Sequence, residues 1–312
     1  MRAFAVRSFG EKPAIHDLPI PAADGAILVR IKYAGPNPID YKLLDRLTAA
    51  SKYPFVMGID FAGVVERVPE GASAFKIGDR IFGMAREHGA YAEYTAALPG
   101  VQTAPVAHIP EGISDEQAAA LPIPAITALG SLELLKVRSG QRLVVMGATG
   151  AVGGYAVQIA RSRGARVIAT VRGDAGEACT LGAEEVYDTK TVDVIDALRK
   201  SHPEGVDAIL DLVNGADAIR RDADILKSGG SLVSSIHVAD VGWFAARKIA
   251  AYNVSPESNP SSSPQGLNDI ARMLLAGTIT ARVRSTFELD AAGQMLEKLR
   301  TGGLRGKAVI RL

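Results

Sequence analysis

Cysteine is almost absent from this chain, because Cys179 is the one cysteine among its 312 residues. A single cysteine excludes an internal disulfide and any zinc site that is built from several cysteines. We expect Cys179 to be a small buried residue on a helix, and the alternative is a reactive thiol.

An excess of one charge and long apolar runs are also missing. Lysine and arginine total 35 against 34 for aspartate and glutamate, so a net charge of +1 gives no field that favours nucleic acid or an anionic membrane. The most apolar stretch, 143–160, is broken by glycines, unlike the roughly 18 uninterrupted apolar residues of a spanning helix. The first residues lack the apolar core of a signal peptide. These absences predict a cytoplasmic protein without nucleic-acid or membrane partners.

What is present is enough chain for two domains, and its first part is rich in strands. In ILVRIKYAG (27–35), apolar side chains alternate with Arg30 and Lys32, as in a strand with one buried face. The residues expected on that face are Ile27, Val29, Ile31 and Tyr33. Short strands separated by Gly, Pro and Asp turns follow, a pattern typical of a compact barrel or sandwich.

From Arg142 onward, strand-like and helix-like segments alternate. The candidate strands are RLVVMG, ARVIATV, EEVYD, VDAILDLV, SLVSSI and KIAAYNV. Short β-branched strands that alternate with helices are typical of a parallel, doubly wound α/β sheet. The segment ESNPSSSPQG (257–266), which follows the last of these strands, has the composition of a linker.

The strand RLVVM runs directly into a glycine-rich turn and then into an apolar helix. A match to G-x-G-x-x-G puts Ala148, Gly150 and Gly153 at the three glycine positions. Small residues there let the backbone approach a pyrophosphate at the helix N-terminus. A merely structural turn is the alternative, but strand, helix and next strand follow in the order that a dinucleotide site requires. The candidate cofactor-binding residues of this turn are Ala148, Thr149, Gly150, Ala151, Val152 and Gly153.

The end of the second strand distinguishes NADP from NAD. An NAD site usually has an acidic residue there, whereas this chain has Val171 followed by Arg172. We expect the Arg172 guanidinium to hold the 2′-phosphate of NADPH by charge-assisted hydrogen bonds. A solvated surface arginine is the alternative, and Asp174 keeps NADH open. Val213 and Asn214, which end another strand, are expected at the same carboxyl edge of the sheet.

Several motifs, in this order, resemble the zinc-free quinone oxidoreductases (zeta-crystallin-like proteins) and their enone-reductase relatives in the medium-chain dehydrogenase/reductase superfamily. The motifs are GPNPIDYK (35–42), YPFVMGIDFAGVV (53–65), FKIGDRIFG (75–83), HGAYAEY (88–94), LPIPAITAL (121–129), VVMGATGAVG (144–153) and GKAVIRL (306–312). The resemblance covers essentially the whole chain. It implies a doubly wound Rossmann NADP-binding domain, residues 122–258, inserted in a GroES-like β-rich substrate domain, residues 1–121 completed by 259–312. It also implies a homodimer formed through the strand KIAAYNV.

Zinc-dependent relatives have a cysteine at the position of Asn37 and a histidine at the position of Ile59. This chain has neither ligand, lacks the four-cysteine structural lobe, and has its histidines scattered along the sequence. We therefore expect no metal site. Without a Lewis acid, oxidation of an alcohol is disfavoured, and reduction of an already electrophilic alkene or quinone is favoured.

The resemblance also implies roles for residues outside the glycine-rich turn. In zinc-free relatives the residue that matches Asn37 lies beside the nicotinamide, although N-P-x-D is equally a good turn sequence. Lys42 matches a lysine that anchors the nicotinamide ribose, with an exposed lysine as the alternative. Tyr53 is expected in the substrate pocket, and Lys42 and Tyr53 are the candidate catalytic proton donors. Thr127 matches a threonine near the nicotinamide half of the cofactor.

Two departures from the relatives bear on the cofactor. Relatives often have a lysine a few residues after the second strand and a tyrosine after the third, and both touch the 2′-phosphate. Here GDAGEA (173–178) contains no lysine, and Thr189 stands about where the tyrosine would be.

The sequence as a whole predicts an NADPH-dependent, metal-independent oxidoreductase that transfers hydride to a quinone or an α,β-unsaturated carbonyl compound. The alternative is a non-catalytic NADPH-binding sensor, scaffold or crystallin-like protein, because a fold does not determine a function.

Overall fold

The computed structural model describes residues 1–22, 25–69, 74–85, 88–173 and 175–312. The chain divides into two compact units. Unit 1 comprises Met1–Pro124 and Ser262–Leu312, and unit 2 comprises Ala125–Ser261. Both divisions lie a few residues beyond the domain boundaries expected from the sequence. Unit 1 is therefore built from both ends of the chain.

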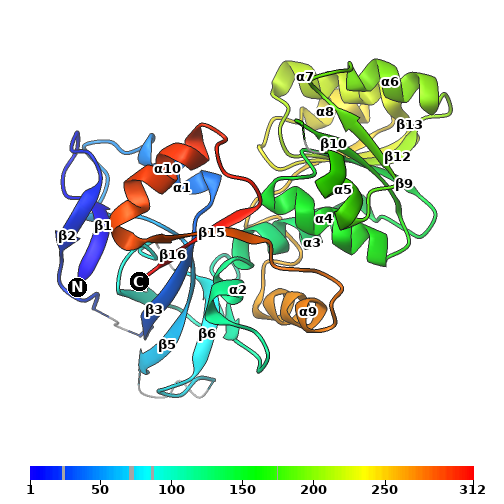
Figure 1. Ribbon diagram of the computed structural model, residues 1–312. Helices are drawn as coiled ribbons and strands as arrows, with labels where there is room; N and C mark the ends of the chain where they lie inside the picture. The colour runs from blue at the N-terminus through cyan, green and yellow to red at the C-terminus, as the bar shows by residue number, and fades with distance from the viewer. Residues whose placement is uncertain (23–24, 70–73, 86–87, 174) are drawn as a thin grey trace. The chain divides into compact units, whose positions relative to one another are not determined.

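Six strands among the described residues of unit 2 form one parallel sheet, in the order β11-β10-β9-β12-β13-β14 (Figure 1). The strands are β9 (Arg142–Met146), β10 (Arg166–Val171), β11 (Glu185–Asp188), β12 (Val206–Asp211), β13 (Leu226–Ser234) and β14 (Ala250–Asn253). The direction of strand addition reverses between β9 and β12, and ligands of doubly wound sheets bind outside the carboxyl ends at this reversal. The predicted doubly wound parallel sheet is confirmed.

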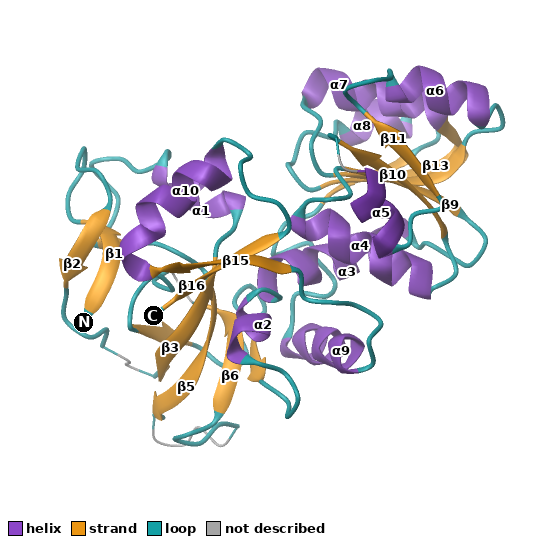
Figure 2. Ribbon diagram, viewed as in Figure 1, coloured by secondary structure: helices purple, strands orange, loops and turns teal. Residues whose placement is uncertain are grey.

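Helices cover both faces of this sheet, with α3, α4 and α5 on one face and α6, α7 and α8 on the other (Figure 2). They are α3 (Pro122–Leu135), α4 (Ala151–Ser162), α5 (Ala175–Leu181), α6 (Val194–Ser201), α7 (Ala216–Arg221), the 3-10 helix η1 (Asp222–Ile225) and α8 (Val241–Ala245). Because both faces are covered, Leu143, Val144 and Val145 of the central strand β9 are all fully buried.

Unit 1 contains two sheets and a few short helices. The larger sheet has the order β15-β16-β3-β5-β6-β8, with β7 also paired to β3, and the smaller sheet has the order β2-β1-β4. The strands are β1 (Arg2–Val6), β2 (Ala14–Asp17), β3 (Ile27–Gly35), β4 (Phe55–Val56), β5 (Asp60–Arg67), β6 (Arg80–Met84), β7 (Tyr94–Ala97), β8 (Val106–His108), β15 (Val283–Glu288) and β16 (Lys307–Arg311). The helices are α1 (Pro38–Leu44), α2 (Asp115–Ala119), α9 (Pro264–Leu275), the 3-10 helix η2 (Leu289–Ala291) and α10 (Ala292–Arg300).

The buried face of β3 differs from its expected composition at one residue. Ile27, Val29 and Ile31 belong to the core, but the next core residue of the strand is Ala34, and Tyr33 is only half-buried. A register irregularity lies between Ile31 and Tyr33 in the pairing with β5. Such a bulge shifts the alternation by one residue, which strict period-two reasoning does not anticipate.

One further expectation from the sequence, the burial of Cys179, is wrong. Cys179 lies on helix α5, as expected, but it is exposed. The segment 257–266 contains the boundary between the two units, at Ser261 and Ser262, as its linker composition predicts. The segment is nevertheless anchored, because the Asn259 amide donates a 3.2 Å hydrogen bond to the Ile126 carbonyl, and Asn259 itself is buried. The buried Ser262 hydroxyl likewise donates to the Gln102 carbonyl at 2.8 Å. Side chains that read as flexible by composition are here anchors for backbone carbonyls.

Across the part of the chain that the structure describes, every helix is too short or too polar to cross a membrane.

Candidate functional site

The glycine-rich turn of unit 2 connects strand β9 to helix α4. Gly147 has a φ of +84° and donates its N–H to the Thr170 hydroxyl at 3.0 Å, while the Ala148 N–H donates to the Thr170 carbonyl at 3.0 Å. Gly150 is the N-cap of α4, which begins at Ala151. The turn is thus fixed to the end of β10, and it brings the six predicted residues Ala148 to Gly153 together at the start of one helix.

The two glycines of this turn have different physical roles. A Cβ on Gly153 would lie 2.3 Å from the Gly147 carbonyl oxygen and 2.8 Å from the Ala148 Cα, so only glycine lets α4 pack this closely on the turn. A Cβ on Gly150 would meet the Gly147 carbonyl oxygen at 3.3 Å, and nothing closer. Gly153 therefore serves helix packing, whereas Gly150 leaves an uncovered backbone at the helix N-terminus.

This arrangement fits a bound pyrophosphate. The first turn of the twelve-residue helix α4 contains no acidic residue. No carboxylate of that turn therefore repels an anion. Its first backbone N–H groups have no acceptor within the helix, and the helix dipole adds positive potential at the same place. A dinucleotide pyrophosphate is the ligand that such an uncovered turn receives in doubly wound sheets.

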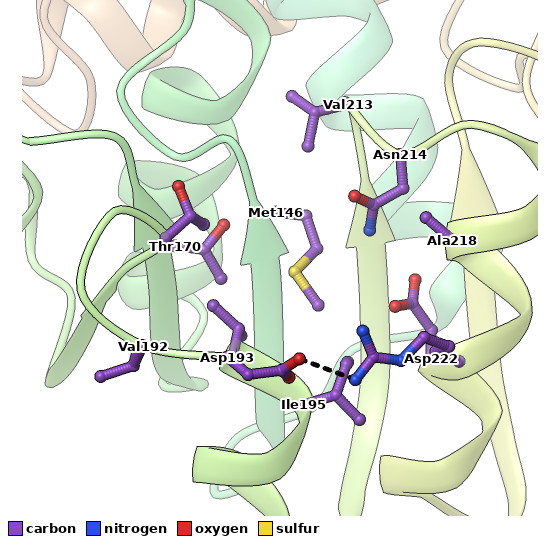
Figure 3. A pocket seen from close by; sticks show the side chains of 12 residues that line it. Met146, Thr170, Val192, Asp193, Ile195, Val213, Asn214, Ala218 and Asp222 are labelled. Carbon is purple, nitrogen blue, oxygen red and sulfur yellow. Dashed lines mark hydrogen bonds and ion pairs between the residues drawn. The ribbon is translucent and has the colours of Figure 1, made fainter.

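A pocket of about 240 Å³ opens beside the carboxyl ends of strands β9, β10 and β12 (Figure 3). Its lining residues are Met146, Thr170, Thr189, Val192, Asp193, Val194, Ile195, Val213, Asn214, Ala218, Arg221 and Asp222. Arg221 and Asp193 form an ion pair of 2.8 Å, drawn as the dashed line in Figure 3. Half of these residues are apolar and half are polar or charged, which suits a ligand that has both an apolar surface and hydrogen-bonding groups. The pocket is large enough for a planar heterocycle.

Val213 and Asn214, predicted from their place at a strand end, line this pocket because Asp211 fixes their backbone. The Asp211 carboxylate accepts the N–H groups of both residues at 2.9 Å. Asp222 is fully buried next to it, and burial together with the charge of Asp211 raises the pKa of Asp222 to about 9. Asp222 is therefore protonated at neutral pH.

Arg172 directly follows β10 and is exposed, and it makes no hydrogen bond or ion pair with the described residues. Thr189, at the position where relatives have a tyrosine, donates its N–H and its hydroxyl to the Val171 carbonyl at 2.9 and 3.1 Å. Its hydroxyl is therefore already engaged with the backbone. Asp174, on which the NADH alternative depends, lies outside the described residues.

In unit 1, Asn37 is the centre of a buried polar network. Its side-chain Nδ2 donates to the Gly35 carbonyl and to Asp60, each at 2.8 Å, and its Oδ1 accepts from Lys307 at 2.7 Å. Lys307 also donates to the Pro36 carbonyl at 2.6 Å. The Asn37 amide therefore has partners on both sides, which fix the turn that precedes α1.

Asp40 extends this network toward the core. One of its oxygens accepts the Asn37 N–H and the Tyr91 hydroxyl, each at 2.7 Å. Burial raises the pKa of Asp40 to about 6 and also raises that of Asp60, whereas it lowers the pKa of Lys307. The positive charge of Lys307 opposes the shift of both carboxylates, so the lysine stabilises their charged forms.

The other predicted site residues are Lys42, Tyr53 and Thr127. Lys42 lies in the last turn of α1 and is half-buried. Tyr53 is also half-buried, and its hydroxyl donates to the Thr48 carbonyl at 2.9 Å. Thr127 lies in unit 2 on α3, and the others just named lie in unit 1.

Sequence reasoning missed several residues of these sites. Thr170 had no signal, because a threonine within a β-branched strand is ordinary. Asp211 and Lys307 stand within the quoted segments VDAILDLV and GKAVIRL, where an ionisable residue directly before or at the end of an apolar strand is a detectable signal. Among the described residues, histidine, cysteine, aspartate and glutamate form no group of three or more that could hold a metal ion.

Two family models match parts of this chain. Residues 23–110 match the alcohol dehydrogenase GroES-like domain, and residues 181–310 match the model described as zinc-binding dehydrogenase. A GroES-like domain joined to a doubly wound dinucleotide-binding sheet defines the medium-chain dehydrogenase/reductase class.

Comparison with individual relatives identifies the family within this class. The rat (Rattus norvegicus) quinone oxidoreductase is 30% identical over 331 aligned positions, which cover 100% of this chain and 98% of the relative. The human quinone oxidoreductase is 34% identical over 242 positions, covering 75% and 72%. The solved quinone oxidoreductase of Coxiella burnetii is 28% identical with a TM-score of 0.88, covering 100% of this chain and 99% of that one. The chain belongs to the quinone oxidoreductase family of medium-chain dehydrogenases/reductases, which are oxidoreductases.

Proposed function

We propose that this protein is an NADPH-dependent oxidoreductase that works without a metal and transfers hydride to a quinone or an α,β-unsaturated carbonyl compound. The observation that carries the proposal is the cradle at the N-terminus of α4, where Gly150 leaves the backbone uncovered. The names of the relatives support the quinone as acceptor.

The residues of unit 2 have the task of binding the cofactor. The N–H groups of Ala151, Val152 and Gly153, in the first turn of α4, hold the pyrophosphate beside the turn Ala148–Gly150, and Arg172 holds the 2′-phosphate, which only NADPH has. Val213, Asn214 and Thr127 complete the cofactor site in this proposal. When bound, NADPH supplies the hydride, and the chain itself supplies binding and orientation.

Independence from metal is supported by the two positions at which zinc-dependent relatives have ligands. Ile59 has no atom that can coordinate a metal, and the Asn37 amide is engaged by Asp60 and Lys307. A conjugated carbonyl or a quinone needs no Lewis acid, because conjugation already makes it a hydride acceptor. An alcohol must lose its proton as the hydride leaves, so it needs either a Lewis acid that lowers its pKa or a general base that takes the proton.

Negative charge develops on the carbonyl oxygen of the acceptor during the transfer and requires a positively polarised donor. Lys42 and Tyr53 are the candidates. The Tyr53 hydroxyl already donates to the Thr48 carbonyl, so Tyr53 would have to give up that hydrogen bond to act as a proton donor. This difference favours Lys42 as the group that interacts with cofactor or acceptor.

The test is a spectrophotometric assay of the purified protein. NADPH is offered with 1,4-benzoquinone or a short-chain enone, and NADP with ethanol or benzyl alcohol, before and after dialysis against a chelator. We expect quinone or enone reduction that the chelator leaves unchanged, with well under one zinc per chain by metal analysis. Alcohol oxidation alone, or activity that only zinc restores, would overturn the proposal. Tight NADPH binding without any turnover would establish the non-catalytic alternative.

A further inference from the structure

Lys190 lies over the turn that follows β10, although it comes from the loop after β11. Its ammonium nitrogen is 3.1 Å from the position that a Cβ of Gly173 would occupy, and its Cε is 3.7 Å from that position. Gly173 has a φ of +101° and directly follows Arg172. The space above this glycine is therefore filled by the lysine side chain.

Backbone hydrogen bonds hold the two loops together. The Asp188 carboxylate oxygen Oδ1 accepts the Gly173 N–H at 3.1 Å and the Lys190 N–H at 2.9 Å. The Thr189 N–H donates to the Val171 carbonyl at 2.9 Å, and Val171 pairs with Asp188 in the sheet. The base of Lys190 is thus fixed to the end of β10, while its flexible stem lies over Gly173.

Lys190 and Arg172 are both exposed, and neither forms an ion pair with a carboxylate of the described residues. Five of the other nine arginines of this unit do form such pairs, for example Arg166 with Glu184 and Arg221 with Asp193. The two cations lie on adjoining loops, and the Asp188 carboxylate that joins these loops accepts backbone N–H groups. A bound dianion is attracted by both side chains.

We infer that Lys190 is a specificity-determining residue that binds the 2′-phosphate of NADPH together with Arg172. This inference rests on the proposed NADPH dependence and adds a residue to it. The lysine missing from GDAGEA is in this chain supplied by the loop after the third strand, one residue beyond Thr189. Lys190 and Arg172 together select a cofactor with a phosphomonoester on its adenosine ribose. NADH has no phosphate at that position.

The experiment measures binding without turnover. The probes are adenosine 2′,5′-bisphosphate and AMP, which differ only by the 2′-phosphate, titrated calorimetrically into the full chain. The variants are Lys190→Met, Lys190→Arg and the control Lys200→Met, which changes an exposed lysine in the last turn of α6. We expect Lys190→Met to weaken the bisphosphate about 10-fold, as for the loss of one charge-assisted hydrogen bond, and AMP by less than about 2-fold. Lys190→Arg and Lys200→Met should stay near the wild type.

The outcomes separate this inference from the proposal on which it rests. A wild type that binds both probes equally would overturn the NADPH preference itself. A wild type that prefers the bisphosphate but is unchanged by Lys190→Met would overturn the inference alone and leave Arg172 as the phosphate ligand. Equal losses for both probes, or an equal loss in Lys200→Met, would also overturn it, because the effect would then be structural or a general effect of charge.

Discussion

Asp222, a single buried carboxyl group, makes the stability of the folded chain depend on pH. Asp222 has its pKa raised from an ordinary value near 3.8 to about 9, because it is buried beside Asp211. Between these values the folded chain holds a proton on Asp222 that the unfolded chain has released. Folding stability from this group is therefore complete below pH 3.8 and falls as the pH rises toward 9.

Asp222→Asn should abolish this loss of folding stability with rising pH, because the amide has nearly the same shape as the carboxyl group and does not ionise. We expect the melting temperature of the variant, relative to wild type, to increase steadily from pH 5 to pH 9, by several degrees in total. Asp217→Asn, at an exposed position of α7, is the control and should show no such trend. A difference that is constant with pH would mean that the Asp222 carboxyl does not titrate as described.

Lys42 allows a kinetic prediction at the same scale. If Lys42 holds the cofactor, Lys42→Met raises the Michaelis constant for NADPH and leaves turnover nearly unchanged. If it stabilises charge in the transition state, turnover falls by about 10- to 100-fold, as for one charge-assisted hydrogen bond. Steady-state kinetics with 1,4-benzoquinone distinguish the two, with the exposed Lys12→Met as control. Unchanged kinetic constants would mean that Lys42 is a surface lysine with no part in cofactor binding or catalysis.

At the scale of elements, the turn between β9 and α4 separates packing from ligand binding. Gly153→Ala places a Cβ 2.3 Å from a backbone oxygen, so α4 must shift, and we expect a loss of about 1–3 kcal/mol in stability together with weaker cofactor binding. Gly150→Ala has its nearest contact at 3.3 Å, so the fold should survive while the new methyl group obstructs the pyrophosphate. Urea unfolding and NADPH titration of both variants check this contrast. Equal stability losses would contradict it.

The sequence predicted these elements well where a periodic pattern or a turn motif coincides with backbone geometry. The parallel sheet and the position of the glycine-rich turn are of this kind, because both depend on neighbouring residues. The bulge in β3 that removes Tyr33 from the core face depends on pairing with a distant strand, so local alternation cannot reveal it. The network of Asn37, Asp60 and Lys307 joins residues from both ends of the chain, and only the fold brings them together.

At the scale of the whole molecule, we predict a homodimer formed through β14, the last strand at one edge of the six-stranded sheet. Its outer backbone groups have no strand partner within the described chain, and an uncovered edge is a ready surface for pairing. Light scattering during gel filtration should give about twice the monomer mass of 32.7 kDa. Ala251→Pro removes an N–H on the side of the strand that faces away from β13, and it should give a monomer with its unit 2 still folded. A monomeric wild type at micromolar concentration would contradict the prediction.

The position of β16 has a consequence for biosynthesis. This strand lies between β15 and β3 in the larger sheet of unit 1, and it carries the lysine that offsets the buried charges of Asp40 and Asp60. On the ribosome, β3 emerges early, whereas β16 emerges only after all of unit 2. Until β16 has been synthesised, the N-terminal part of unit 1 has an unpaired sheet edge, and the charges of Asp40 and Asp60 lack the lysine that offsets them. Unit 2 is contiguous in sequence, so all the residues of its sheet are available before β16 emerges. Chaperone dependence of this protein should accordingly originate in unit 1, which only the last strand completes.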